Sequence, residues 1–375
     1  MRILHIYKDY YPPIVGGMEM SMALLCREMR TRAEVEALVC SRSIRSRVRT
    51  ADNVRVTEVG ELGRILSAPV APLFPLFLKR ARYDILHFHL PNPTAVMSYL
   101  LGRPPGRVVV HYHSDIVRQA FALRLYAPFL RKLLRLAQAI IVTSPNYLDT
   151  SEHLRPFREK CRVIPLGIDL GELELRGAEE AGVHALREKY GGPFVLFVGV
   201  LRYYKGVEYL VQAMQQVDCH LVVIGDGPER PRLERMAEVS GLSGRIHFAG
   251  ETPQRELVQH YRACEVFVFP GSHRSEAYGL SLVQALACGK PAVSTRLGTG
   301  TSFVNLDGET GLVVEPRDPA ALAGALNRLL NDAALRRRFG DQAGVRARTF
   351  FSKEKMVSDM WALYQQLLSA PANTR

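Results

Sequence analysis

The chain has 375 residues, of which 47% are hydrophobic and 23% are charged. This length exceeds what one typical core requires and suits two α/β domains. No apolar stretch approaches the roughly 20 uninterrupted residues of a membrane-spanning helix, so a transmembrane protein is excluded and a soluble, globular chain is expected.

The net charge of +12 is concentrated in the first half of the chain. Residues 1–170 hold 25 Lys and Arg against 14 Asp and Glu, whereas the remainder holds 24 against 23. A positive field of this kind attracts nucleic acid, anionic lipid or phosphorylated substrates, and by itself it does not choose among them.

Six cysteines are scattered along the chain without the paired spacing of metal ligands: Cys26, Cys40, Cys161, Cys219, Cys264 and Cys288. We therefore expect reduced core residues rather than disulfides or a structural zinc site. Met1 is followed directly by a buried-strand pattern, which differs from the layout of a signal peptide. The sequence predicts a cytoplasmic location.

The first half alternates short apolar runs with amphipathic stretches. Strands are expected at residues 3–7, 35–40, 54–59, 85–88, 108–112 and 140–143, with helical periodicity between several of them. This alternation is typical of a parallel sheet covered by helices. It predicts a first α/β domain over residues 1–167.

A polar stretch rich in Gly and Glu follows at residues 169–182 and marks the expected domain boundary. Beyond it, strands are expected at residues 194–198, 221–224, 246–248, 266–269 and 291–295, with helices at 207–216 and 279–288. We predict a second Rossmann-like, doubly wound domain over residues 168–352. Residues 353–370 carry one apolar helical face and are expected to pack back on the first domain.

Gly16 and Gly17 follow the first strand after two prolines, just before a helix begins. Bare backbone amides at a helix start bind anions, which suits a phosphate. The G-x-G-x-x-G fingerprint of dinucleotide-binding folds is absent, so a nicotinamide cofactor is not expected. A tight turn that needs glycine's positive φ is an equally good interpretation.

In the second half, the strand at residues 194–198 leads into Arg202 and Lys205. The carboxyl ends of strands are where open α/β sheets bind ligands, and two cations there can converge on one diphosphate. A solvated basic loop is the alternative. Gly225 lies at the same edge after the strand at residues 221–224, where a turn is the simpler role.

The strand at residues 266–269 is joined to the next helix by a polar loop that contains Glu276. A carboxylate beside a helix start can accept hydrogen bonds from sugar hydroxyls. The amides of Gly279 and Leu280 remain available for phosphate.

This combination of motifs resembles the retaining glycosyltransferases of family four, also called group 1 glycosyltransferases, over nearly the whole chain. The resemblance implies a GT-B fold, in which two Rossmann-like domains face each other across a cleft. The family's E-x7-E motif is met by Glu276 at its first position, whereas Gln284 occupies the second. The resemblance implies that the first residue contacts the donor sugar and the second binds ribose hydroxyls, here through a neutral amide that bonds more weakly than a carboxylate.

The same resemblance assigns Gly16 and Gly17 to the donor diphosphate on one domain, and Arg202 with Lys205 to it on the other. His113 resembles the family's active-site histidine, although a histidine at a strand end is more often structural. His87 and His89 share one strand face and are interpreted as lining the cleft. As a zinc pair they lack a third ligand in the local sequence.

The implied activity is transfer of a hexose from a nucleoside diphosphate sugar with retained configuration, without a metal ion or another cofactor. The stretches at residues 112–119 and 298–305 resemble bacterial mannosyl- and rhamnosyltransferases of surface polysaccharide synthesis, which weakly indicates a GDP-linked donor. The acceptor is expected to be a lipid-linked sugar or an oligosaccharide.

Two basic, apolar segments at residues 73–82 and 118–135 predict binding to an anionic membrane surface, on the inner face of the cytoplasmic membrane. Ordinary packing of an apolar helix face is the alternative for each segment. The rival functions are another GT-B enzyme such as a sugar-nucleotide epimerase or glycan phosphorylase, a non-catalytic homologue, and a basic module for nucleic acid. No RNA-binding signature of cations among exposed aromatics is present, so nucleic acid is not expected as a partner.

Overall fold

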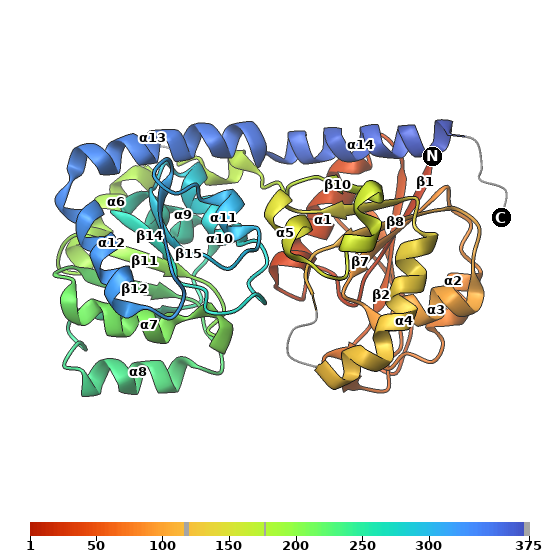
Figure 1. Cartoon of the computed structure of the whole chain (residues 1–375), viewed down its shortest axis with the longest axis horizontal. Helices are drawn as coiled ribbons and strands as arrows, with labels where there is room; N and C mark the ends of the chain where they lie inside the picture. Colours follow the sequence, from red (N-terminus) through yellow and green to blue (C-terminus); the bar gives the residue numbers. More distant parts are fainter. Residues whose placement is uncertain (116–119, 176–177, 371–375) are drawn as a thin grey trace. The chain divides into compact units, whose positions relative to one another are not determined.

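The chain divides into two compact units, each with its own sheet and core (Figure 1). The computed structural model describes residues 1–115, 120–175 and 178–370. The first unit comprises residues 1–167 and the segment that starts at Lys353, and the second unit is Ile168–Ser352. Among the described residues, no helix is both long enough and apolar enough to cross a bilayer.

Within its described residues, the first unit is built on an eight-stranded sheet in the order β10-β9-β8-β7-β1-β2-β4-β3. Neighbouring strands are parallel except β3, which runs antiparallel to β4 at the edge. The strands are β1 (Arg2–Ile6), β2 (Glu34–Cys40), β3 (Arg47–Ala51), β4 (Val54–Val59), β7 (Ile85–Leu90), β8 (Arg107–Tyr112), β9 (Ala139–Val142) and β10 (Cys161–Val163); β5 (Arg64–Ile65) and β6 (Ala68–Pro69) form a separate short hairpin. The central strands are buried along almost their whole length because helices cover both faces of the sheet.

The C-terminal helix belongs to the first unit, where it packs against α1 (Figure 1). Met356, Met360 and Tyr364 of this helix share a core with Met22 and Cys26 of α1. The helices of this unit are α1 (Gly17–Met29), α2 (Phe74–Lys79), α3 (Pro93–Gly102), α4 (Ala120–Leu136), α5 (Pro145–Thr150) and α14 (Lys353–Ser369), with the 3₁₀ segment η1 (Arg155–Lys160). The apolar periodicity of residues 353–370 is therefore the face that completes this core.

The second unit has a six-stranded sheet within its described residues, in the order β13-β12-β11-β14-β15-β16. All neighbouring strands are parallel. They are β11 (Phe194–Val198), β12 (His220–Ile224), β13 (Ile246–Gly250), β14 (Val266–Phe269), β15 (Ala292–Thr295) and β16 (Gly311–Val314). The chain winds outward in one direction from β11 and in the other from β14. These two central strands therefore form a topological switch point, the place where open α/β sheets bind ligands.

Helices cover both faces of this second sheet. One core joins the strands to α7, α8, α12 and α13, while α6 packs against α9 and α10 against α13 (Figure 1). The helices are α6 (Ala178–Lys189), α7 (Val207–Ala213), α8 (Arg230–Val239), α9 (Gln254–Ala263), α10 (Leu280–Ala287), α11 (Thr301–Val304), α12 (Pro319–Asn331) and α13 (Ala333–Phe350), with the 3₁₀ segments η2 (Leu170–Leu173), η3 (Tyr203–Lys205) and η4 (Met214–Gln216). The helix expected at residues 207–216 is thus α7 followed by η4.

Candidate active site

Two loops meet at the switch point of the second unit. The loop after β11 contains Arg202 and η3, and it presses against the loop after β14. Gly206 follows η3 with φ +68°, and a Cβ atom there would overlap the carbonyl of Pro270. The amide of Ser272 donates to the carbonyl of Tyr204 at 2.8 Å. Only glycine permits this close approach, and the approach places Lys205 beside the second loop.

Lys205 and Glu276 form an ion pair in this contact. Lys205 Nζ lies 2.6 Å from Glu276 Oε2, and the two side chains are 15% and 8% exposed. The ammonium also lies 5.2 Å from the centre of the Phe269 ring, which limits its access to water. The pair is therefore largely desolvated, and its charges act more strongly on a neighbouring group than solvated charges do.

Hydrogen bonds to its backbone carbonyl groups hold the loop that contains Glu276 in place. Thr299 Oγ1 donates to the Glu276 carbonyl at 2.8 Å, and the Gly300 amide donates to Ala277 at 2.8 Å. Gly279 then opens α10 with φ +92°, where a Cβ would press into the Phe269 ring. The first amides of α10, beginning at Leu280, have no partner within their own helix and are suited to an anion.

Gln284 lies one turn into α10 and is half-buried. Its Oε1 accepts a hydrogen bond from the Tyr261 hydroxyl at 3.1 Å. The side-chain amide nitrogen has no partner among the described residues, so Gln284 can donate a hydrogen bond to a ligand. A glutamate at this position has only acceptors to offer.

The other two predicted residues of this unit differ in their environments. The Arg202 side chain is exposed and makes no hydrogen bond or ion pair with any residue that the structure describes. Gly225 has φ +123°, and a Cβ there would overlap the Gly199 carbonyl. Gly225 is thus required by backbone packing between two loops, which favours its interpretation as a turn residue.

In the first unit, Gly16 and Gly17 mark the beginning of α1. Gly16 is the extended residue before the helix, and Gly17 is its first residue. Glu19 lies in the first turn, is 7% exposed, and has its carboxyl group next to Gly16. Burial raises the pKa of Glu19 and so favours the neutral carboxyl group. The sequence analysis gave Glu19 no role. The feature that could have indicated one is the position of an acidic residue in the first turn of a helix that was expected to bind an anion.

His113 belongs to a cluster of buried histidines in the first unit. Strands β1, β7 and β8 are neighbours, and their register places His5 beside His87 and His89 beside His111. These residues and His113 are between 0% and 4% exposed. Burial lowers the pKa of His113 to about 3, so its imidazole is neutral near pH 7 and acts there as a hydrogen-bonding group rather than as a charged acid.

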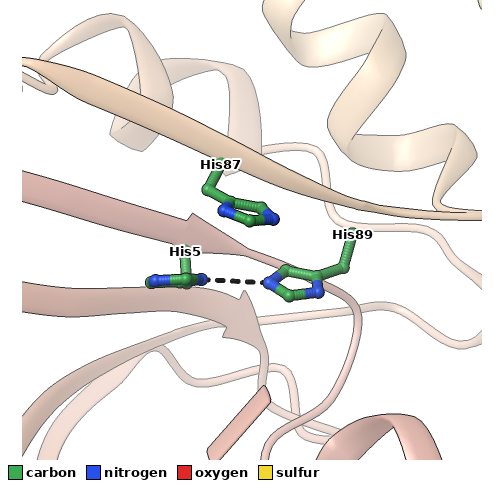
Figure 2. A group of neighbouring side chains, drawn as sticks. All are labelled: His5, His87 and His89. Atoms are coloured by element: carbon green, nitrogen blue, oxygen red, sulfur yellow. Dashed lines mark hydrogen bonds between the residues drawn. The ribbon is translucent and has the colours of Figure 1, made fainter. Parts of the chain in front are cut away.

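Hydrogen bonds connect three of these rings into a chain. His5 Nδ1 lies 3.0 Å from His89 Nε2, and His89 Nδ1 lies 3.0 Å from His113 Nε2. Figure 2 shows His5, His87 and His89 gathered together, with the contact between His5 and His89 dashed. The prediction that His87 and His89 line a cleft is wrong, because these side chains are 0% and 1% exposed. The sequence analysis missed the neighbouring His5, because β1 and β7 pair through residues that lie more than 80 positions apart in the sequence.

The structure brings Arg202, Lys205, Glu276, Gly279, Leu280 and Gln284 to the carboxyl ends of β11 and β14 in the second unit. Gly16, Gly17 and His113 lie in the first unit.

Residues 15–172 match the family described as Glycosyltransferase Family 4, and residues 182–346 match Glycosyl transferases group 1. The chain therefore belongs to the group 1 (family 4) glycosyltransferases. O-antigen chain mannosyltransferase C of Escherichia coli is 33% identical over 373 residues, which cover 99% of this chain and 100% of the relative. D-rhamnosyltransferase WbpZ of Pseudomonas aeruginosa is 36% identical over 355 residues, covering 94% and 92%. The predicted family and its glycosyltransferase activity are confirmed.

Solved structures show the same fold. Sucrose-phosphate synthase from Thermosynechococcus elongatus aligns with this glycosyltransferase over 98% of the chain and 99% of the synthase, with a TM-score of 0.83 and 25% identity. The Anabaena protein HepE in complex with UDP aligns over 98% and 100%, with a TM-score of 0.77 and 19% identity. The GT-B fold predicted from the sequence is confirmed.

The Lys205–Glu276 ion pair of this glycosyltransferase predicts that removing one of its charges destabilises the fold more than removing both. Replacing Lys205→Met leaves the buried Glu276 carboxylate without its cation and should lower the free energy of unfolding of the second unit by about 3 kcal/mol. The double variant Lys205→Met with Glu276→Gln should recover most of that loss, since no charge is then buried alone. Chemical denaturation followed by circular dichroism measures both effects.

The matched control is Arg296→Met, which breaks an exposed ion pair with Glu315 in the same unit. It should cost less than about 1 kcal/mol, because solvent already screens that pair. A loss for Lys205→Met as small as that for Arg296→Met would contradict the prediction.

Proposed function

We propose that this glycosyltransferase transfers mannose or rhamnose from a nucleoside diphosphate sugar, with GDP as the favoured nucleotide, during synthesis of a surface polysaccharide. The Lys205–Glu276 pair at the switch point carries the structural part of the proposal. It offers a cation for a diphosphate and a carboxylate for sugar hydroxyls at one place. The sugar and the pathway are inferred from the O-antigen mannosyltransferase and the rhamnosyltransferase, both of which align over almost their full lengths.

Each residue has a role in this proposal that follows from its chemistry. Lys205 and the exposed Arg202 bind the diphosphate and stabilise the negative charge that develops on it as the sugar departs. Glu276 accepts hydrogen bonds from the sugar, and the first amides of α10 at Gly279 and Leu280 bind a phosphate oxygen. Gln284 donates to a ribose oxygen. The reaction needs no metal ion in this proposal, because the protein's own cations neutralise the leaving group.

The first unit supplies the acceptor side in the same proposal. Gly16 and Gly17 present the start of α1 to the diphosphate, and burial raises the pKa of the neighbouring Glu19 carboxyl group. His113 is a neutral ring beside the sugar in this proposal; its Nε2 is engaged by His89, and its buried Nδ1 has no partner among the described residues.

Donor preference is tested by the melting temperature of the protein with UDP-, GDP-, ADP- and dTDP-sugars, since a ligand that binds only the folded state raises it. We expect the largest shift with GDP-mannose or GDP-rhamnose. Gln284→Glu should tighten binding of that donor by up to about 10-fold, because the ribose hydroxyl would then donate to a charged acceptor, which forms a stronger hydrogen bond than the neutral amide donor does. A larger shift with another nucleotide would refute the GDP assignment, and no shift with any would argue against a donor site.

The stereochemistry of the reaction is a separate test. A retaining enzyme given an α-linked donor should produce an α-linked product, which the anomeric coupling in an NMR spectrum of the product reports. In the same assay, Lys205→Met with Glu276→Gln should lower kcat by about 100-fold or more, since it removes both the leaving-group cation and the carboxylate that binds the sugar. A β-linked product would overturn the assignment of retention.

We also propose that the acceptor is lipid-linked and that the outer face of α4 binds an anionic membrane surface from the cytoplasmic side. Leu125 and Phe129 of α4 are 66% and 40% exposed and lie among the exposed cations Arg124, Arg131 and Lys132. Arg118, which the sequence also placed in this segment, lies outside the described residues. In α2, Phe74 and Leu78 are buried in the core, so only part of the apolar face expected there remains exposed.

The membrane proposal predicts that the protein floats with vesicles of phosphatidylglycerol and phosphatidylcholine at low salt. Replacing Leu125→Ser and Phe129→Ser together should reduce the bound fraction several-fold, because their apolar surface no longer enters the interface. Val239→Ser is the matched control, since Val239 is an 89% exposed residue of α8 in the other unit. Equal binding by the double variant and the wild type would rule out α4 as the contact.

A further inference from the structure

The buried histidines offer a set of ligand atoms that the sugar-transfer reaction does not use. His5 comes from β1, whereas His87 and His89 come from the neighbouring strand β7. One ring nitrogen of each residue lies within 4.8 Å of those of the other two. Figure 2 shows the three side chains gathered together, and the His87 ring is stacked against those of His5 and His89, with ring centres 4.7 and 4.6 Å apart. The nearest pair of nitrogens, His5 Nδ1 and His89 Nε2, is 3.0 Å apart.

Hydrogen bonds within the protein leave part of this cluster unsatisfied. His87 Nε2 is buried and has no hydrogen-bond partner among the described residues. A buried polar atom left in this way destabilises the folded chain. The neutral imidazole is the form that binds metals.

We propose that His5, His87 and His89 form a binding site for one divalent transition-metal ion, with Zn²⁺ as the best fit. Three imidazoles without a carboxylate suit zinc, copper or nickel and do not suit magnesium or calcium, which prefer oxygen ligands. Two imidazole nitrogens on one tetrahedral zinc ion are about 3.3 Å apart when each lies about 2.0–2.1 Å from it, which is close to the spacing of His5 and His89.

The surroundings of the triad match what a metal site requires beyond its ligands. His87 Nδ1 is hydrogen bonded to the Tyr364 hydroxyl of α14, so Nε2 is the nitrogen left to bind an ion. His89 uses Nδ1 for His113, so its Nε2 is the ligand atom. Such outer partners orient metal-bound histidines and increase their basicity.

The metal ion has a consequence for His113. An ion on His89 Nε2 leaves the ring proton on Nδ1, which then donates to His113 Nε2. His113 must in turn carry its own proton on Nδ1, so one tautomer of the proposed active-site histidine is fixed. The ion is therefore structural and positions His113 without taking part in sugar transfer.

A second group, His89, His111 and His113, is also close enough to hold an ion. An ion there that used His89 Nδ1 would replace the hydrogen bond between His89 and His113, just as an ion in the first triad replaces the one between His5 and His89. The two groups differ at His111, which has no hydrogen-bond partner for either ring nitrogen among the described residues and so lacks an outer partner of the kind that Tyr364 provides. This difference favours the first triad, and His111 becomes the control within the cluster.

The test uses the full-length protein without a histidine tag. The chelated protein is titrated with Zn²⁺ while its melting temperature is recorded, and with Co²⁺ while its visible absorption is recorded. We expect about one ion per chain and a rise in melting temperature. His5→Gln and His87→Gln should weaken zinc binding by more than about 100-fold. His111→Gln should retain it, as should His260→Gln, which removes a buried histidine of the second unit.

Tyr364→Phe gives an independent measurement if a ligand variant does not fold. It removes only the hydroxyl that bonds to His87, and it should weaken zinc binding by about 10-fold. The proposal is overturned if the wild type gains no stability with Zn²⁺, if His5→Gln and His87→Gln bind as well as the wild type, or if His111→Gln abolishes binding while they do not. None of these outcomes depends on the sugar donor, so they leave the proposed transferase reaction untouched.

Discussion

The arrangement of the second unit depends on the backbone contact between residue 206 and the carbonyl of Pro270, which only a glycine allows. This contact joins the loops after β11 and β14 at the switch point of the sheet. It lets Lys205 reach Glu276, and it leaves Arg202 exposed beside them. A cation and a carboxylate that are distant in sequence are thus brought together at the switch point by a backbone contact between their loops.

The two units differ in the charge state of their buried polar groups. In the second unit, the largely desolvated side chains of Lys205 and Glu276 form an ion pair, so each charge is compensated by the opposite one. In the first unit, burial favours neutral rings for His5, His87, His89, His111 and His113. A neutral ring still has a lone pair, which makes this region suited to a hydrogen bond or a metal ion and unsuited to free charge.

Much of this could be predicted from the sequence because buried parallel strands form continuous apolar runs. Arg202, Lys205 and Glu276 could be grouped because each directly follows such a run, and strand ends collect at one edge of a sheet. The edge strand β3 was not predicted, since its residues are mostly exposed and polar. The neighbourhood of His5, His87 and Tyr364 was also hidden, because it depends on which distant segments pack together. Local periodicity carries no information on that choice.

The placement of α14 in the first unit has a consequence for how the protein is made. The ribosome completes residues 1–167 and the whole second unit before it synthesises Lys353 to Ser369, and domains generally fold as units during synthesis. The core beneath α1 cannot be completed before α14 is made, because Met356, Met360 and Tyr364 are part of it. The histidine cluster is therefore sealed late, which gives an ion from the surrounding solution time to reach a place that the finished protein encloses.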